Sequence, residues 1–141
     1  MVEKKPSGGF SKEELEAMKE TLKERSLGDK EGEEAVREKI NALPAPDRTM
    51  AKRLDAIIRG AAPSLVPKPW YGMPAYATRD GRIICFFQGA SKFKARYATL
   101  GFSDKAGLDE GNMWPNSYAL MKLTGAEEAK IAALVKKAVK G

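Results

Sequence analysis

The sequence contains no histidine and only one cysteine, Cys85. Without histidine, Ser-His-Asp and Cys-His catalysis are excluded, and so are zinc sites of the usual Cys/His kind. A lone cysteine excludes an internal disulfide framework. Because Cys85 lies in the apolar stretch Ile83–Phe87, we expect a buried, unreactive thiol. No nucleophile–base pair or cofactor motif is visible either, so the sequence predicts a protein that is not an enzyme.

Long apolar runs are also missing. No stretch approaches the roughly 20 residues that a membrane-spanning helix needs, and no apolar segment follows the charged N-terminus, as a secretory signal would require. We therefore expect no membrane partner and a cytoplasmic location. The 141 residues fit one domain. We predict a disordered tail at residues 1–10 and a single domain over residues 11–141.

The positive charge is unevenly placed. Of the formal net charge of +6, none arises in residues 1–60, where 13 basic residues balance 13 acidic ones. The whole excess lies in residues 61–141. A basic half attracts anionic partners, although the same charge also serves solubility.

Apolar residues spaced three and four apart predict helices over residues 12–25, 32–43 and from Asp47 to about residue 59. Two capping boxes, Ser11–Glu14 and Thr124–Glu127, predict where the first and last helices begin. The last helix presents Ile131 and Val135 to the core. Gly60 and Pro63 close the third helix.

Strands are predicted between the third and last helices, at residues 75–79, 82–88, 93–100 and 117–123. Asp80-Gly81 suits a two-residue hairpin turn, and one helical turn is expected at residues 104–108. The order indicates an α+β fold. We expect N-terminal helices, an antiparallel sheet of about four to five strands, and a C-terminal helix packed on the sheet.

The stretch Trp70–Tyr76 holds three aromatic residues, a glycine and a proline, which is typical of a shaped, packed loop. One interpretation is an apolar pocket with polar indole and phenol tips. The alternative is that the aromatic residues form the core under the helices. The candidate ligand-binding residues of this group are Trp70, Tyr71, Met73, Tyr76, Phe87 and Trp114.

Lys92, Lys94 and Arg96 alternate with apolar residues, and this pattern predicts a strand with its cations on one face, about 6.6 Å apart. The face is either an anion-binding row, for nucleic acid or a phosphorylated molecule, or a solvated face that discourages edge aggregation. A second, weaker signal is metal binding by Asp104, Asp109 and Glu110, which lie in a glycine-rich segment without the spacing of an EF-hand loop.

Three segments together resemble the YdhG-like family of small bacterial domains, long classed as of unknown function. They are Trp70–Tyr76, Gly81–Phe87 and Lys92–Phe102, and the resemblance covers about residues 45–139, with a helical extension at residues 11–44. It implies an α+β fold similar in outline to frataxin. Some members are regarded as intracellular iron chaperones, which makes iron the one cofactor that the resemblance implies. This chain departs from that expectation because it is basic and lacks histidine.

The sequence therefore predicts a small, non-enzymatic binding module with an aromatic concavity beside a basic strand face. Its ligand is expected to be a small anionic or aromatic molecule or a partner protein. The alternatives are a frataxin-like protein that binds and delivers iron, and non-specific nucleic-acid binding.

Overall fold

The computed structural model describes residues 12–16 and 28–140. Residues 12–16 are helical, as the pattern predicts, and all five are exposed. The predicted tail at residues 1–10, the Ser11 cap and residues 17–25 of the first predicted helix lie outside the described residues.

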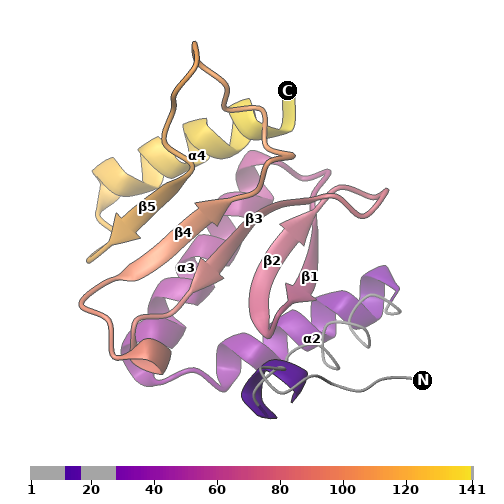
Figure 1. The fold of residues 1–141 in the computed structure, drawn as a ribbon, viewed down its shortest axis with the longest axis vertical. Helices are drawn as coiled ribbons and strands as arrows, with labels where there is room; N and C mark the ends of the chain where they lie inside the picture. The colour runs from indigo at the N-terminus through magenta and orange to yellow at the C-terminus, as the bar shows by residue number, and fades with distance from the viewer. Residues whose placement is uncertain (1–11, 17–27, 141) are drawn as a thin grey trace, which may run out of the picture.

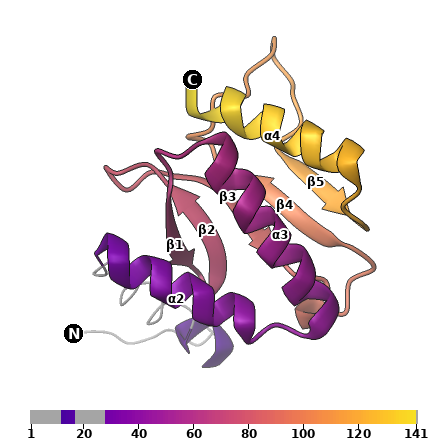
Figure 2. The same cartoon turned by 180° about the vertical axis from the view of Figure 1, so that it is seen from behind.

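The chain forms an α+β fold built on one five-stranded antiparallel sheet, in the order β1-β2-β3-β4-β5. Figures 1 and 2 show the three long helices on one face of this sheet; α3 crosses its middle and α4 lies behind β4 and β5. The helices are α2 (Asp29–Asn41), α3 (Ala45–Ala61) and α4 (Gly125–Lys140), and the strands are β1 (Val66–Trp70), β2 (Met73–Ala77), β3 (Ile83–Gln88), β4 (Ala98–Phe102) and β5 (Ser117–Leu120).

The core lies between the helices and the sheet face that they cover. Leu54 and Ile58 of α3 are buried there against Leu100 of β4 and Val135 of α4. Burying a large aliphatic side chain stabilises the fold by about 1.5–3 kcal/mol, so this layer holds the helices on the sheet. No helix in the described part of the chain combines the length and the apolarity that crossing a bilayer demands.

Both predicted starts of α2 and α3 are too late. Helix α2 begins at Asp29, where the Gly28 N–H donates to the Glu31 carboxylate. Helix α3 begins at Ala45, with Pro46 in its first turn, where a missing N–H costs nothing. Asp47, predicted to cap α3, is instead a buried residue inside that first turn.

The stretch Trp70–Tyr76 is the tip and second strand of a hairpin between β1 and β2. Trp70 pairs with Met73, and the two residues between them have φ of 50° (Tyr71) and 78° (Gly72). Positive φ at both central positions is the turn geometry that follows the twist of antiparallel strands. Strand β1 is missing from the predictions because two of its five residues are prolines.

The predicted strand over residues 93–100 is wrong in its first half. Residues Ser91–Phe93 form a short 3-10 helix, Lys94 has a φ of 53°, and β4 starts only at Ala98. The Ala95 N–H donates to the Ala90 carbonyl at 2.9 Å, which closes a tight loop in place of a strand. The helical turn expected at residues 104–108 is also absent, because hydrogen-bonded turns occupy that segment.

Candidate functional site

The predicted aromatic pocket is not formed, because the sheet divides its residues between two faces. Tyr76 and Phe87 are 1% and 2% exposed and belong to the core under the helices. Trp70 pairs with Met73, which lies three positions before Tyr76 on β2. Because successive residues of a strand point to opposite faces, Trp70 and Met73 lie on the face opposite to Tyr76. This separation corrects the prediction that one concavity is lined by all of them.

The rings of Trp70, Tyr71 and Phe86 gather on the other side of the sheet. Figure 1 shows that α2, α3 and α4 do not cover this face. The Trp70 ring centroid lies 5.0 Å from that of Tyr71, in an edge-on arrangement, and 5.3 Å from that of Phe86. Met73 pairs with Trp70 across the turn. Tyr71 is 44% exposed. Trp70, Tyr71 and Met73 are among the predicted candidates, whereas Phe86 is not, because its position on this face depends on strand register.

Trp114 lies apart from this group, before β5. It is half-buried and packs against the edge of the core. Together with Asn112, Met113 and Asn116 it lines a shallow surface hollow of about 330 Å³. The surface of this hollow is more polar than apolar, and Met113, at 90% exposed, is the side chain that brings apolar surface to solvent there.

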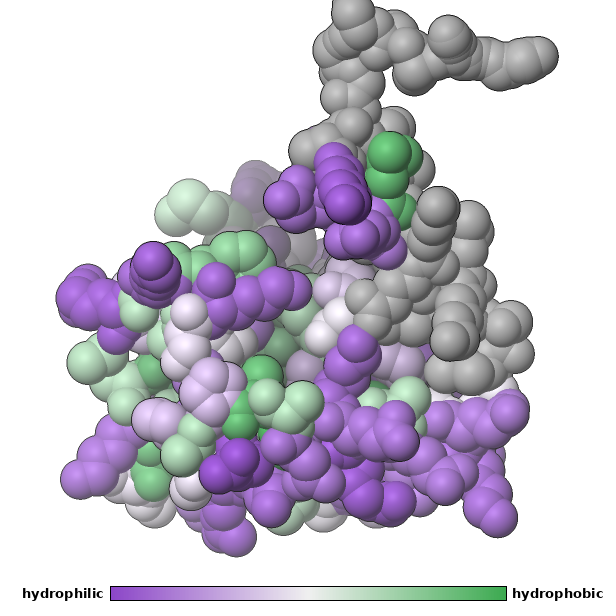
Figure 3. All heavy atoms as spheres, turned by 90° about the horizontal axis from the view of Figure 1, so that it is seen from below, coloured by the Kyte–Doolittle hydropathy of each residue, from purple (hydrophilic) through white to green (hydrophobic). Residues whose placement is uncertain are grey.

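Lys92, Lys94 and Arg96 do not form the predicted row on a strand. They lie instead on an exposed loop, residues 92–97, which we call the basic–aromatic loop. Lys92 Nζ lies 5.5 Å from the centroid of the Phe93 ring, and Arg96 Cζ lies 5.3 Å from that of Tyr97. The two rings are 59% and 39% exposed. The end of the molecule that carries this loop faces the viewer in Figure 3, where hydrophobic residues show between hydrophilic ones.

Among the residues that the structure describes, the cations of the basic–aromatic loop have no acidic partner. Within the described part of the chain, the ion pairs engage other basic residues, such as Arg53 with Glu128 and Lys137 with Glu110. An exposed ring beside an unneutralised cation offers a stacking surface and a positive charge at one place. The sequence named the three cations but not Phe93 or Tyr97, whose exposure follows from the loss of strand alternation.

Asp47 holds the start of this loop. Its carboxylate accepts hydrogen bonds from the backbone N–H groups of Ala90, at 3.3 Å, and Ser91, at 3.0 Å. Gly89 is needed beside it, because a Cβ there would lie 2.6 Å from Asp47 Oδ2. Asp47 is only 5% exposed, and a buried carboxylate requires such partners. The sequence offers no sign of this contact, which joins residues 43 positions apart.

The three candidate metal ligands are not brought together. Asp104 and Asp109 are exposed, while the Glu110 carboxylate accepts a hydrogen bond from Lys137 Nζ at 2.8 Å, which lowers the pKa of Glu110. Across residues 12–16 and 28–140, no three acidic or cysteine side chains are grouped as metal ligands would be. Iron binding stays a prediction from resemblance.

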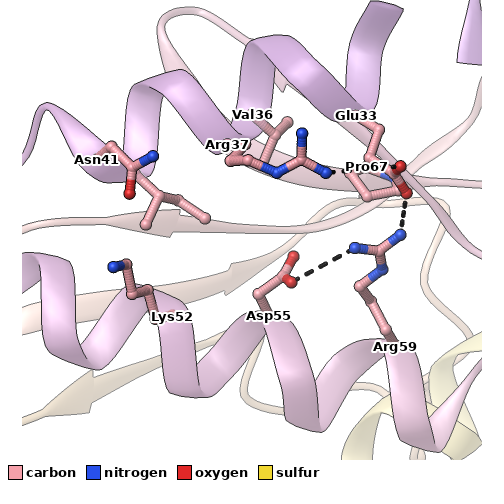
Figure 4. Close-up of a pocket in the computed structure, with 9 residues that line it drawn as sticks. Glu33, Val36, Arg37, Asn41, Lys52, Asp55, Arg59 and Pro67 are labelled. Atoms are coloured by element: carbon pink, nitrogen blue, oxygen red, sulfur yellow. Dashed lines mark hydrogen bonds and ion pairs between the residues drawn. The ribbon is translucent and has the colours of Figure 1, made fainter. Parts of the chain in front are cut away.

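A cleft of about 110 Å³ lies between α2 and α3 and is floored by Val36, Ile40 and Pro67. Figure 4 shows Glu33, Asp55 and Arg59 pointing toward one another across the cleft, with Arg37 also directed at Glu33. Arg59 pairs with Glu33 and, at 3.6 Å, with Asp55. Asp55 also accepts a 2.6 Å hydrogen bond from the hydroxyl of Tyr76.

Because Arg59, Glu33 and Asp55 are paired with one another, the cleft is better explained as a set of ion pairs that covers the core than as a ligand site. Burial, followed by the nearby Asp55 carboxylate, raises the pKa of Tyr76. Cys85 also lies in the core, where burial raises the pKa of its thiol to about 12. A thiol that keeps its proton is a poor nucleophile, which agrees with the expected unreactive cysteine.

No protein-family model matches this chain, and the searches of curated proteins and of solved structures likewise find no match. The resemblance to the YdhG-like family therefore stays a prediction.

Proposed function

We propose that this protein is a non-enzymatic binding module, and that its basic–aromatic loop holds ligands that combine negative charge with planar rings. The observation that carries the proposal is the pairing of each exposed ring with a cation, Lys92 with Phe93 and Arg96 with Tyr97. Nucleotides of a single-stranded nucleic acid have both properties, since their phosphates meet cations and their bases stack on aromatic rings.

The loop is anchored at both ends, which supports the proposal. Asp47 fixes the loop at its start, and β4 fixes it at its end, so the rings and cations lie on a tethered segment. A tethered loop loses less conformational freedom on binding than a free chain does. The net charge of +6 further favours encounter with an anionic ligand.

The test is binding of fluorescein-labelled oligothymidylate, followed by fluorescence anisotropy over a range of salt concentrations. Replacing Lys92, Lys94 and Arg96 together by Ala should weaken binding at least tenfold and reduce the dependence of affinity on salt. Replacing Phe93 and Tyr97 by Leu should weaken it about fivefold or more by removing stacking. The ring variant should leave the salt dependence unchanged.

The matched control removes three cations from the other end of the molecule. Lys105, Lys136 and Lys140 are exposed; the first follows β4 and the other two lie in the last turns of α4. Figure 1 shows both of these segments at the end of the molecule away from the loop. Their replacement by Ala lowers the net charge equally and should change the affinity less than threefold. Equal losses for both triple variants would mean that net charge alone attracts the ligand, and the proposal would be wrong.

A further inference from the structure

The two edges of the sheet differ in their capacity to accept another strand. At the β5 edge, the Phe102 N–H donates to the Asn116 carbonyl, and the register then pairs Leu100 with Tyr118 and Ala98 with Leu120. Hydrogen-bonded pairs alternate with non-bonded ones in an antiparallel ladder. The backbone N–H and C=O groups of Ser117 and Ala119 therefore point away from β4, and no described residue bonds to them.

The β1 edge is closed in two ways. Trp70, Lys68 and Val66 bond to β2, which leaves Pro67 and Pro69 at the outward positions, and proline has no N–H to donate. Helix α2 also packs against this edge, so closely that a Cβ at Gly32 would lie 3.0 Å from the Pro67 carbonyl oxygen. Within residues 12–16 and 28–140, an incoming strand thus finds outward donors at the β5 edge and not at the β1 edge; β5 ends the sheet in Figure 1.

The surroundings of β5 differ at its two ends. At its start lies the hollow lined by Met113 and Trp114. At its end, Leu120 pairs with Ala98, so the exposed Met121 and Lys122 come next to the end of the basic–aromatic loop. Lys130 adds a third source of positive charge, with its Nζ 5.8 Å from the ring of Tyr118 on β5. One end of the strand therefore offers the Met113 and Trp114 side chains beside two asparagines, Asn112 and Asn116, and the other end is cationic.

From these features we infer that β5 docks an extended segment of a partner protein, which adds to the sheet as an antiparallel sixth strand. The segment carries acidic residues at its N-terminal end, beside the cations, and an apolar residue at its C-terminal end, for the hollow. Backbone bonds to Ser117 and Ala119 give the affinity, and the two ends fix direction and register. This inference rests on the proposed function in one respect, because the loop supplies part of the positive charge.

A second copy of the chain fits this edge less well. Two β5 strands meeting side by side would bring together two chains that each carry a net charge of +6. Like charges oppose such an approach, whereas an acidic segment is attracted to the same place. The occupant of this edge is therefore an acidic segment, and self-association through β5 would overturn the inference.

The experiment is an NMR titration of the ¹⁵N-labelled full chain with the peptide acetyl-Glu-Glu-Val-Thr-Val-Thr-Leu-amide. Saturable shifts at the amides of Ser117 and Ala119, with slower hydrogen exchange at both, are the expected result. A peptide of the same composition in reverse order should bind at least fivefold more weakly. A peptide with alternate amides N-methylated on the edge that faces β5 should not bind, and this control leaves the protein unchanged.

A variant of the protein tests the same backbone hydrogen bonds by changing β5 instead of the peptide. Ala119→Pro removes an outward donor without removing a bond to β4, and should weaken peptide binding at least tenfold. Ser117→Ala keeps its backbone donor and should change binding less than twofold. If Ala119→Pro does not fold, as judged by its circular dichroism, the N-methylated peptide decides the question alone.

The failures of the two proposals are distinguishable. If the loop variants lose oligothymidylate while peptide addition leaves the Ser117 and Ala119 amides unshifted up to 5 mM (roughly the weak limit of specific binding), the proposed function stands and strand addition is wrong. If oligothymidylate shifts these two amides as strongly as the peptide, the edge is not selective for a polypeptide. Dimerisation through β5 in sedimentation experiments would also overturn the inference.

Discussion

The ring of Phe86 lies directly over Gly101 of the neighbouring strand, so that a Cβ at Gly101 would come within 2.2 Å of Phe86 Cζ. The two residues pair across β3 and β4 on the face that no described helix covers. A Gly101→Ala substitution has to push the ring aside and disturb its contact with Trp70. We expect the free energy of unfolding to fall by about 1–3 kcal/mol, measured by urea denaturation.

Gly60→Ala is the matched control for this prediction. Gly60 lies in α3 with no atom within 4 Å of the position that a Cβ would take. Alanine has the higher helix propensity, by about 0.5–1 kcal/mol, so this variant should be more stable than the natural chain. If both variants lost stability equally, the contact between Phe86 and Gly101 would not explain the first result.

Asp47→Ala should lower the free energy of unfolding by about 1.5–3 kcal/mol, because two backbone N–H groups lose a charged acceptor. The loop held by those groups should also loosen, which hydrogen exchange at Ser91 would detect. Asp104→Ala is the comparison, since Asp104 is exposed, and its stability should stay within about 0.5 kcal/mol. Unchanged exchange at Ser91 in Asp47→Ala would contradict the assigned contact.

Tyr76→Phe should cost about 1.5–3 kcal/mol of stability through the lost hydrogen bond to Asp55. In a double-mutant cycle, removing Asp55 as well should add much less than its separate effect, because the two groups act as one pair. Tyr97→Phe provides the control, as Tyr97 is 39% exposed and should be nearly neutral. Additive effects of the Tyr76 and Asp55 substitutions would show that the pair is not coupled.

Alkaline pH should destabilise the protein through its buried acids. Cys85 keeps its proton up to a pKa of about 12 in the folded chain, whereas a thiol in the unfolded chain ionises from about pH 8.5. Between these values the unfolded state binds fewer protons, so stability falls as pH rises, by at most about 1.4 kcal/mol per pH unit. The raised pKa of Tyr76 acts in the same direction above about pH 10.

Cys85→Ala tests this account. The variant should be less stable at pH 7 because a buried group is lost, but its stability should decline less steeply between pH 9 and pH 11, measured by thermal unfolding across that range (roughly the window set by the two pKa values). Parallel declines in both proteins would mean that Cys85 does not contribute.

Sequence patterns predicted the elements whose causes are local. Leu54 and Ile58 on α3, and Ile131 and Val135 on α4, are buried as their spacing predicts. One of the two bonds of the capping box predicted to open α4 is confirmed, the 2.7 Å bond from the Thr124 N–H to the Glu127 carboxylate, to which the Thr124 hydroxyl also donates. A helix face or a cap is set by residues within one turn, so a short window of sequence contains its physical cause.

The features that the sequence did not predict depend on residues elsewhere in the chain. Strand β1 exists because β2 and α2 pack against it, in spite of its two prolines. The alternation in residues 92–97 resembles a strand, but Asp47 on α3 holds the preceding backbone in a tight loop. The candidate site likewise has a part that local sequence predicts and a part that it does not. The three cations were predicted, but the arrangement of their side chains was not.

The prolines at the outward positions of β1 limit how large an assembly this sheet can build. Because the described residues offer outward donors at one edge of the sheet only, a sheet that gains a strand at β5 has no second edge among them at which to grow. Two chains meeting through this edge would close into a pair and stop there, whereas open-ended stacking into fibres needs two receptive edges on every chain.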